Sequence, residues 1–157
     1  MSAASNHLEN ILLDHVLRGV TAPYTAPSTV YVALFSDAGS AASAALESGT
    51  SSTSTGTGNW GHFEIDNASY ARQSVQFAAA GAVTTGTISS NQTVSFPVAS
   101  ADYDTAGATG NVVTHLAIMD ASTGGNVLFY GALTTSKTVS AGDQFTISSG
   151  NLSISLA

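Results

Sequence analysis

The 157-residue chain contains no cysteine and very few positive charges. Without cysteine it can form neither a disulfide framework nor a thiolate metal site, so its stability must come from packing or from assembly. Its 3 Lys and Arg residues stand against 10 Asp and Glu residues, which gives a net charge of −7. Because binding to a phosphate backbone requires several cations, nucleic acid and anionic membrane are unfavourable partners.

Charge of either sign is scarce, and long apolar runs are absent. Only 8% of the residues are charged, against about 25% in ordinary soluble domains, so Ser, Thr, Asn, Gly and Ala must cover the surface. No apolar run approaches the ~18–20 residues of a membrane-spanning helix. The first ten residues, MSAASNHLEN, also lack the basic start and apolar stretch of a secretory signal. We expect a soluble protein made in a cytoplasm, without a membrane partner.

The chain length suits one domain over residues 1–157, since domains commonly contain roughly 100–150 residues. A single helix is predicted over residues 5–18, because Asn6 and Glu9 have the spacing of a capping box and Gly19 follows the last turn. Several positions give this helix a broad, mostly apolar side: Leu8, Ile11, Leu12, His15 and Val16, widened by Leu13 and Leu17. A face this apolar must pack against something.

Short runs of β-branched and aromatic residues, separated by turn-forming residues, follow the helix. They predict strands at about residues 29–35, 70–77, 93–98, 112–120, 126–135, 144–148 and 151–156. Two hairpins are expected, with turns inside IMDASTGGNVLF and TVSAGDQFTI. In the last segment, apolar residues alternate with Ser153 and Ser155, as in a half-buried antiparallel strand. The pattern predicts a mainly β fold, an antiparallel β-sandwich of jelly-roll-like type with one N-terminal α-helix.

Residues 39–59, GSAASAALESGTSSTSTGTGN, form a polar, low-complexity insertion. Compact domains seldom carry so long a loop without a binding role or mobility. The composition predicts a loop that is disordered in isolation. The alternative is that this segment becomes ordered against a neighbouring subunit.

No arrangement of residues predicts catalysis or a cofactor. The chain has four histidines: His7, His15, His62 and His115. None of them shows the HxxxH or HExxH spacing of a zinc site. The Asp102-Tyr103-Asp104 stretch begins like a calcium loop but lacks the bidentate glutamate. No nucleophile elbow and no phosphate-binding loop occurs. We therefore predict no enzymatic activity, no catalytic residue, no cofactor and no metal.

The aromatic residues leave a carbohydrate-binding module open as a less favoured alternative. Five of them could stack on a sugar if they were exposed: Tyr24, Trp60, Tyr70, Tyr103 and Tyr130. Aromatic residues in strands and turns, however, belong more often to a core or to a protein interface.

A series of segments resembles a known family. They are, in order, LLDHVLRG, TAPSTVYVALFSDAG, YARQSVQF, NQTVSFPVASADYD and the stretch from VVTHLAIMD to the C-terminus. This series is similar to small virion proteins of tailed bacteriophages, which are often labelled tail fibre proteins and are similar to head decoration or cement proteins. The family usually has a shorter segment in place of residues 39–59.

The resemblance implies a non-enzymatic β-sandwich building block of the phage particle, located in the virion after assembly in the host cytoplasm. The main prediction is a capsid decoration or cement protein that binds the major capsid protein of the assembled head. The alternative is a tail-associated component of a fibre, tube or baseplate. Either would be a homo-oligomer, with a trimer suited to capsid three-fold positions, and would also contact other virion proteins.

Six residues are candidates for contacts between chains: Leu8, Ile11, Leu12, Val16, Trp60 and Arg72. The helix positions follow from the apolar side described above. Arg72 is notable because it is one of three cations and falls inside a predicted strand. Its planar fork could lock a subunit seam, or it could form an internal pair within the fold. The residues leave both interpretations open.

Overall fold

The computed structural model describes residues 3–19, 24–37, 41–48, 58–78, 86–105 and 112–155. Over these ranges the protein is mainly β, with antiparallel strands and two α-helices, α1 (Asn6–Leu17) and α2 (Ala41–Ser48). A short 3-10 helix, η1 (Trp60–His62), precedes the third strand. The predicted mainly β class and the predicted N-terminal helix are confirmed.

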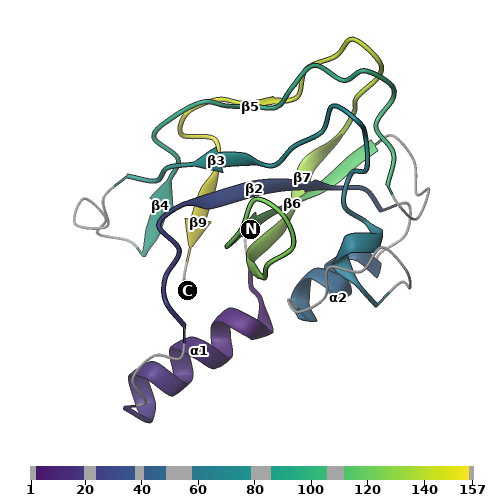
Figure 1. Ribbon diagram of the computed structural model, residues 1–157. Coiled ribbons are helices and arrows are strands. Elements are labelled where there is room, and N and C mark those ends of the chain that lie inside the picture. The colour runs from purple at the N-terminus through teal and green to yellow at the C-terminus, as the bar shows by residue number, and fades with distance from the viewer. Residues whose placement is uncertain are drawn as a thin grey trace.

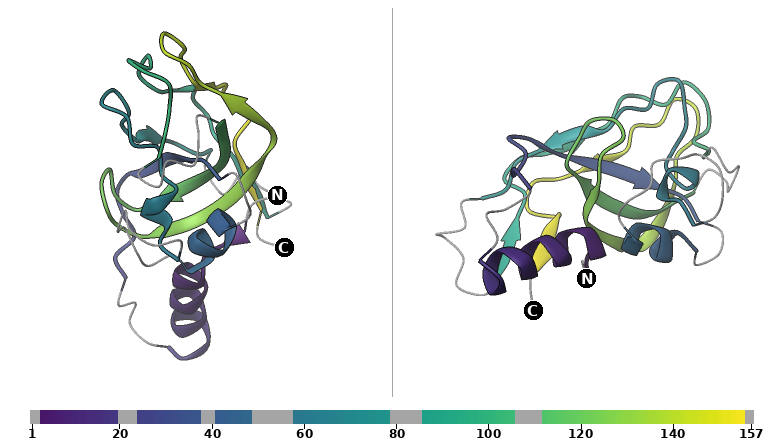
Figure 2. Two further views of the ribbon diagram at one scale, coloured as in Figure 1. Left: turned by 90° about the vertical axis from the view of Figure 1, so that its right-hand side faces the viewer. Right: turned by 60° about the horizontal axis from the view of Figure 1, so that its bottom comes forward.

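A five-stranded antiparallel sheet forms the centre of the molecule (Figure 1). Its spatial order is β1 (Ala3–Ala4), β7 (Val127–Thr138), β6 (Val112–Met119), β2 (Val30–Phe35) and β3 (Gln73–Val75). The central pair β6 and β7 is irregular, because its register shifts between Val113 and His115 and again between Ile118 and Met119. Such bulges bend a strand and increase its twist, and β7 is visibly curved in Figure 2.

Two small antiparallel ladders lie beside this sheet. One pairs β4 (Thr87–Ser89) with β9 (Ser153–Ser155), and the other pairs β5 (Val94–Ser95) with β8 (Thr146–Ile147). Each of the seven predicted strand segments contains or overlaps one observed strand, whereas β1 and β4 are not predicted. In β9 the buried Ile154 alternates with exposed serines, as the sequence pattern indicates.

One of the two predicted hairpins is correct. Strands β6 and β7 pair across their turn, where Asp120 N–H donates to the Asn126 carbonyl at 3.1 Å. The second turn forms, but β8 pairs with β5 and not with β7. The reason is that Ala99 N–H donates to the Asp143 carbonyl and Phe96 N–H to the Phe145 carbonyl. The hairpin prediction is therefore wrong for this segment, whose backbone groups bond to a strand distant in the sequence.

Side chains alternate between two cores on opposite faces of the sheet. In β2, Val32 and Leu34 join the larger core, which also includes side chains of β5, β8 and β9. Ala33 and Phe35 join the second core, with α2 and Trp60. Because both faces of β2 are covered, its sequence is a continuous apolar run.

Helix α2 lies inside the segment predicted to be a disordered loop, and that prediction is wrong for residues 41–48. Ala42, Ala45 and Leu46 are buried in the second core. Their i, i+3, i+4 spacing is that of a one-sided helix. The carboxylate of Asp37 accepts from Ala42 N–H at 2.8 Å at the start of the helix, and Glu47 bonds to Tyr130 of β7. The remainder of the insertion lies outside the described residues, except for residues 58 and 59.

Helix α1 is anchored at its first residues and projects from the body of the molecule (Figures 1 and 2). Its N-cap is Ser5, one residue before the predicted Asn6 cap. The buried Ser5 hydroxyl accepts from Leu8 N–H at 3.3 Å and donates to the Val127 carbonyl at 2.5 Å. A cap that also bonds to the sheet fixes where the helix starts and how it leaves the sheet.

Candidate functional site

Exposed apolar side chains gather on the second half of α1. Among the described residues, five large apolar side chains are exposed: Leu12 (40%), Leu13 (54%), Val16 (71%), Leu17 (74%) and Val98 (54%). The first four lie on α1, which contains no buried residue. We call these four residues the α1 patch. Contiguous exposed apolar surface of this kind marks an interaction site more often than scattered apolar residues do.

The structure separates the predicted helix contacts into two groups. Leu8 is half-buried and packs on the larger core, and Ile11 is also half-buried. Leu12 and Val16 belong to the α1 patch. The patch also contains Leu13 and Leu17, which are not among the candidate contacts. The helical period alone could not decide which part of the broad apolar side faces inward, because that depends on the anchor at Ser5.

Arg72 is buried inside the chain, with 8% of its surface exposed. Its Nε and Nη2 atoms donate to the two carboxylate oxygens of Glu64, at 2.6 and 2.7 Å. Its Nη1 atom donates to the carbonyls of Ala121 and Gly124, at 2.9 and 2.8 Å. Arg72 thus forms an ion pair inside the fold, which is one of the two interpretations that the sequence left open. It does not line the α1 patch.

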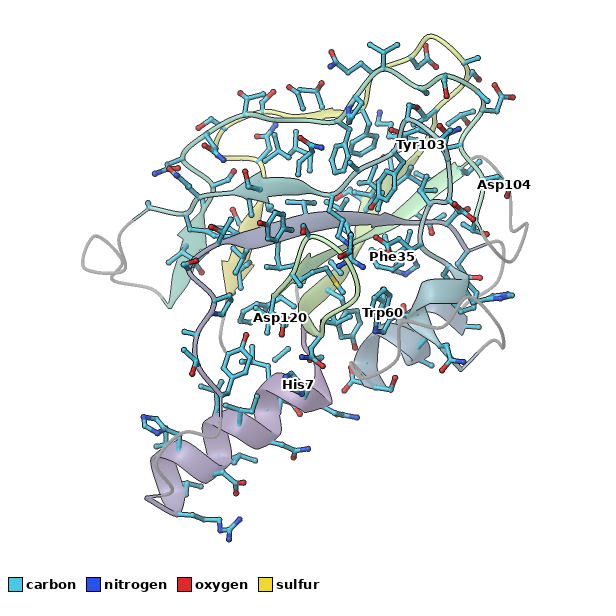
Figure 3. The ribbon with its side chains drawn as sticks, in the orientation of Figure 1. His7, Phe35, Trp60, Tyr103, Asp104 and Asp120 are labelled. Atoms are coloured by element: carbon cyan, nitrogen blue, oxygen red, sulfur yellow. The ribbon has the colours of Figure 1, made fainter. Side chains whose placement is uncertain are left out.

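Trp60 also lies inside the chain, in the core between the sheet and α2, where it faces Phe35 (Figure 3). The two rings meet edge to face with centroids 6.3 Å apart, and the Arg72 guanidinium lies 5.1 Å from the Trp60 ring centroid. Only 1% of Trp60 is exposed, and Tyr103 is fully buried. Neither ring can serve as a stacking platform for a sugar in this conformation, which removes two of the five aromatic residues of the carbohydrate alternative.

Tyr70 extends the Arg72 network into the sheet. Its hydroxyl accepts from Leu34 N–H at 3.0 Å and donates to Glu64 Oε1 at 3.2 Å. Burial and the adjacent Glu64 carboxylate raise the pKa of Tyr70 well above its ordinary value of 10.0. The hydroxyl therefore stays protonated and acts as a structural donor.

A second polar network holds α2 on β6. The Ser43 hydroxyl lies 3.0 Å from His115 Nε2, and His115 Nδ1 lies 2.9 Å from the Thr114 hydroxyl. The Thr114 hydroxyl also accepts from Asp37 N–H at 3.0 Å. Burial lowers the pKa of His115, and the Asp37 carboxylate partly opposes this effect. Because a hydroxyl and not a carboxylate contacts Nδ1, the arrangement differs from a Ser-His-Asp triad.

The predicted loop carboxylates bond to backbone groups. Asp102 Oδ1 accepts from Ala141 N–H at 2.9 Å. Within the described ranges, no three His, Asp or Glu side chains come together as metal ligands. In the same ranges, no helix has the length and apolar character needed to cross a bilayer.

The fold defines a mainly β, antiparallel protein with a projecting apolar helix. A family model described as podophage GP4 fiber I protein gp80 matches residues 3–155. The chain belongs to this family of phage fibre proteins, which confirms the resemblance to tailed-phage virion proteins and implies a virion component. Curated proteins give no match to the chain. A family of fibre proteins fits the tail-associated alternative better than capsid decoration.

Proposed function

We propose that the chain is a non-enzymatic, tail-associated structural component of a phage particle whose copies assemble through the α1 patch. The α1 patch is the observation that carries the proposal. Its four side chains project from the body on a helix that buries none of its own residues. Membership in a fibre protein family supports a place in the tail.

The partners in this proposal are further copies of the chain and other virion proteins, brought together during assembly in the host cytoplasm. Interface centres are typically apolar and poor in charge. The α1 patch has this character, because Asp14 and Arg18 bond to each other at 2.7 Å and lie on the other side of the helix. Many copies held side by side gain affinity through multivalency, so a charged hot spot is unnecessary.

The assembly part is tested by sedimentation of the purified protein. We expect the wild-type chain to self-associate and the Val16→Lys/Leu17→Lys variant to remain monomeric. Both side chains are more than 70% exposed, and cations are favourable in the last turn of a helix, so the variant should fold. Val98→Lys is the matched control, since Val98 is exposed but lies outside α1. A wild-type monomer at high concentration contradicts the assembly proposal.

The location is tested by electron microscopy of phage particles carrying a labelled copy of the chain. Label at the tail is the expected result. Label distributed over the head would instead support the capsid decoration prediction and a contact with the major capsid protein.

A further inference from the structure

A surface groove runs between β7 and the C-terminal segment, residues 143–154. Its two adjoining stretches have volumes of about 180 and 590 Å³, and both are lined by Leu116, Leu133, Thr134 and Asn151. Five apolar side chains along the groove are only partly buried by the larger core: Leu116, Phe129, Leu133, Phe145 and Leu152. We call this feature the β7 groove.

The outer edge of β7 is open along the groove. Strand β1 pairs with Phe129 and Tyr130, and no described strand pairs with β7 on that side beyond Tyr130. Residues 134–138 are exposed. Native proteins usually cover or guard such an edge, because unpaired backbone and half-buried apolar side chains favour association.

We infer that the α1 patch of one copy occupies the β7 groove of the next copy. This inference rests on the proposed function, since it names the surface that receives the α1 patch. The chain carries one convex apolar surface without a cover and one concave surface with a partly apolar floor. A second copy supplies the complement of each.

Charge complementarity favours a second copy as the occupant. Glu9 is exposed on α1 one helical turn before Leu13, at the end of the α1 patch nearest the body. Lys137 is exposed and lines the groove. Of the chain's three cations, Arg18 and Arg72 bond to carboxylates, whereas Lys137 has no carboxylate within 4.0 Å in the described residues. Asp143 also lines the groove, but its carboxylate accepts from Ser140 N–H at 2.9 Å. Lys137 is therefore the groove charge without a bonded partner in the described residues, and its sign is opposite to that of Glu9.

Thr134 marks the middle of the β7 groove, because it lines both of its stretches. Strand β7 bulges at this point, since Val113 pairs with Lys137 and His115 already pairs with Ala132. An α1 patch seated in the groove with Glu9 toward Lys137 therefore brings the far end of the patch, at Val16, toward Thr134.

A contact between two different surfaces of the same chain is head-to-tail. It closes into a ring when the rotation per copy divides a full turn, and otherwise it continues as a filament. Both outcomes suit a structural component present in many copies. Pairing of α1 with α1 would instead give a closed dimer and would leave the β7 groove empty.

The absence of cysteine from the sequence allows a clean cross-linking test. A Val16→Cys variant and a Thr134→Cys variant are mixed in equal amounts under mild oxidation, at a concentration where sedimentation shows association. Both positions are exposed, so neither substitution should prevent folding. We expect a disulfide between positions 16 and 134 in the mixture, identified by mass spectrometry.

The chain carrying both cysteines should give a ladder of cross-linked oligomers. Ala101→Cys, at an exposed loop position outside both surfaces, is the matched control and should not cross-link with either variant.

Three results would overturn the inference. Disulfides that join two copies of the Val16→Cys variant to each other would show α1 pairing with itself. Association without any link between positions 16 and 134 would show that α1 docks elsewhere, with the proposed function intact. A monomeric mixture would remove the assembly on which both proposals depend.

Discussion

Arg72 joins three parts of the fold that lie apart in the sequence. It bonds to Glu64 after η1 and to the carbonyls of the turn between β6 and β7, and it lies over Trp60 of the second core. Its side chain is 4% exposed and that of Glu64 is 15% exposed. Removing one partner of such a pair leaves a poorly solvated charge, which is more damaging than the loss of a surface pair.

We predict that Arg72→Met lowers the free energy of unfolding by about 3–5 kcal/mol. Arg72→Lys should lower it by about 2 kcal/mol, because an ammonium cannot make the bidentate contact and reach both carbonyls together. Urea unfolding followed by the fluorescence of Trp60, the single tryptophan, measures both values. Arg18→Met is the control and should change stability by less than about 0.5 kcal/mol, since that pair is exposed. Equal effects at the two positions would contradict the structural role of Arg72.

Gly125 is required by both its backbone angle and its surroundings. Its φ is +73°, and a Cβ there would lie 2.3 Å from Asp120 Oδ1 and 2.8 Å from Ala121 Cβ. Asp120 cannot move freely, because its carboxylate accepts from Asn126 N–H and the Asn126 side chain. We predict that Gly125→Ala destabilises the fold by at least about 2 kcal/mol, through strain and steric overlap together.

Gly142→Ala is the matched control for this prediction. Gly142 has a φ of +90°, but a Cβ there would meet nothing within 4 Å. Only the backbone strain of about 1 kcal/mol should therefore remain. The difference between the urea unfolding midpoints of the two variants measures the destabilisation caused by steric overlap at Gly125. Equal midpoints would contradict the predicted overlap.

The sequence indicates that Arg72 matters but not what it contacts. A cation inside a strand of a charge-poor chain is visible as a pattern. Its partner Glu64 could not be selected among ten acidic residues, because the pairing depends on how η1 and β3 approach each other in space. The same holds for Trp60, whose burial depends on helix α2, and the composition of residues 39–59 hides that helix.

At the scale of elements, helix α2 shows why composition can mislead. Residues 39–59 are polar and repetitive overall. The three apolar residues Ala42, Ala45 and Leu46 therefore change the mean hydropathy of this segment very little. Those three side chains nevertheless join Trp60 and Phe63 in covering one face of the sheet. Strand positions were predictable because each run alternates or is continuously apolar, whereas the pairing of β8 with β5 depends on distant contacts that no local pattern contains.

The docking of α2 on β6 should depend on pH through His115. Burial lowers the pKa of this imidazole below its ordinary value of 6.5. Between 6.5 and the lowered value, the unfolded chain binds a proton here more readily than the folded chain does. We predict that the free energy of unfolding falls as the pH drops from about 7 through this window and that His115 contributes no slope above it.

Urea unfolding between about pH 7.5 and 5 measures this dependence, and His115→Gln should reduce the slope. The control is Ser136→Gln at an exposed position of β7, which removes no titratable group and should leave the slope unchanged. An unchanged slope in the His115 variant would show that this imidazole is not the group responsible.

At the scale of the whole molecule, low charge and a projecting apolar helix belong together. A net charge of −7 makes two copies repel each other in solution. The proposed assembly takes the attraction that must exceed this repulsion from the α1 patch, because the described residues offer only Lys137 as a cation without a carboxylate partner. Assembly through apolar contact tolerates the scarcity of charge that first appears in the sequence.

This balance predicts how salt affects assembly. The Debye length falls from about 10 Å at 0.1 M salt to about 3 Å at 1 M. Added salt therefore screens the repulsion between two copies of charge −7, whereas it weakens the inferred contact between Glu9 and Lys137 by at most about 1 kcal/mol. Self-association measured by sedimentation should strengthen severalfold between about 0.1 and 0.5 M sodium chloride. The Val16→Lys/Leu17→Lys variant should remain monomeric throughout. Dissociation of the wild-type assembly by salt would mean that ion pairs, and not the α1 patch, hold the copies together.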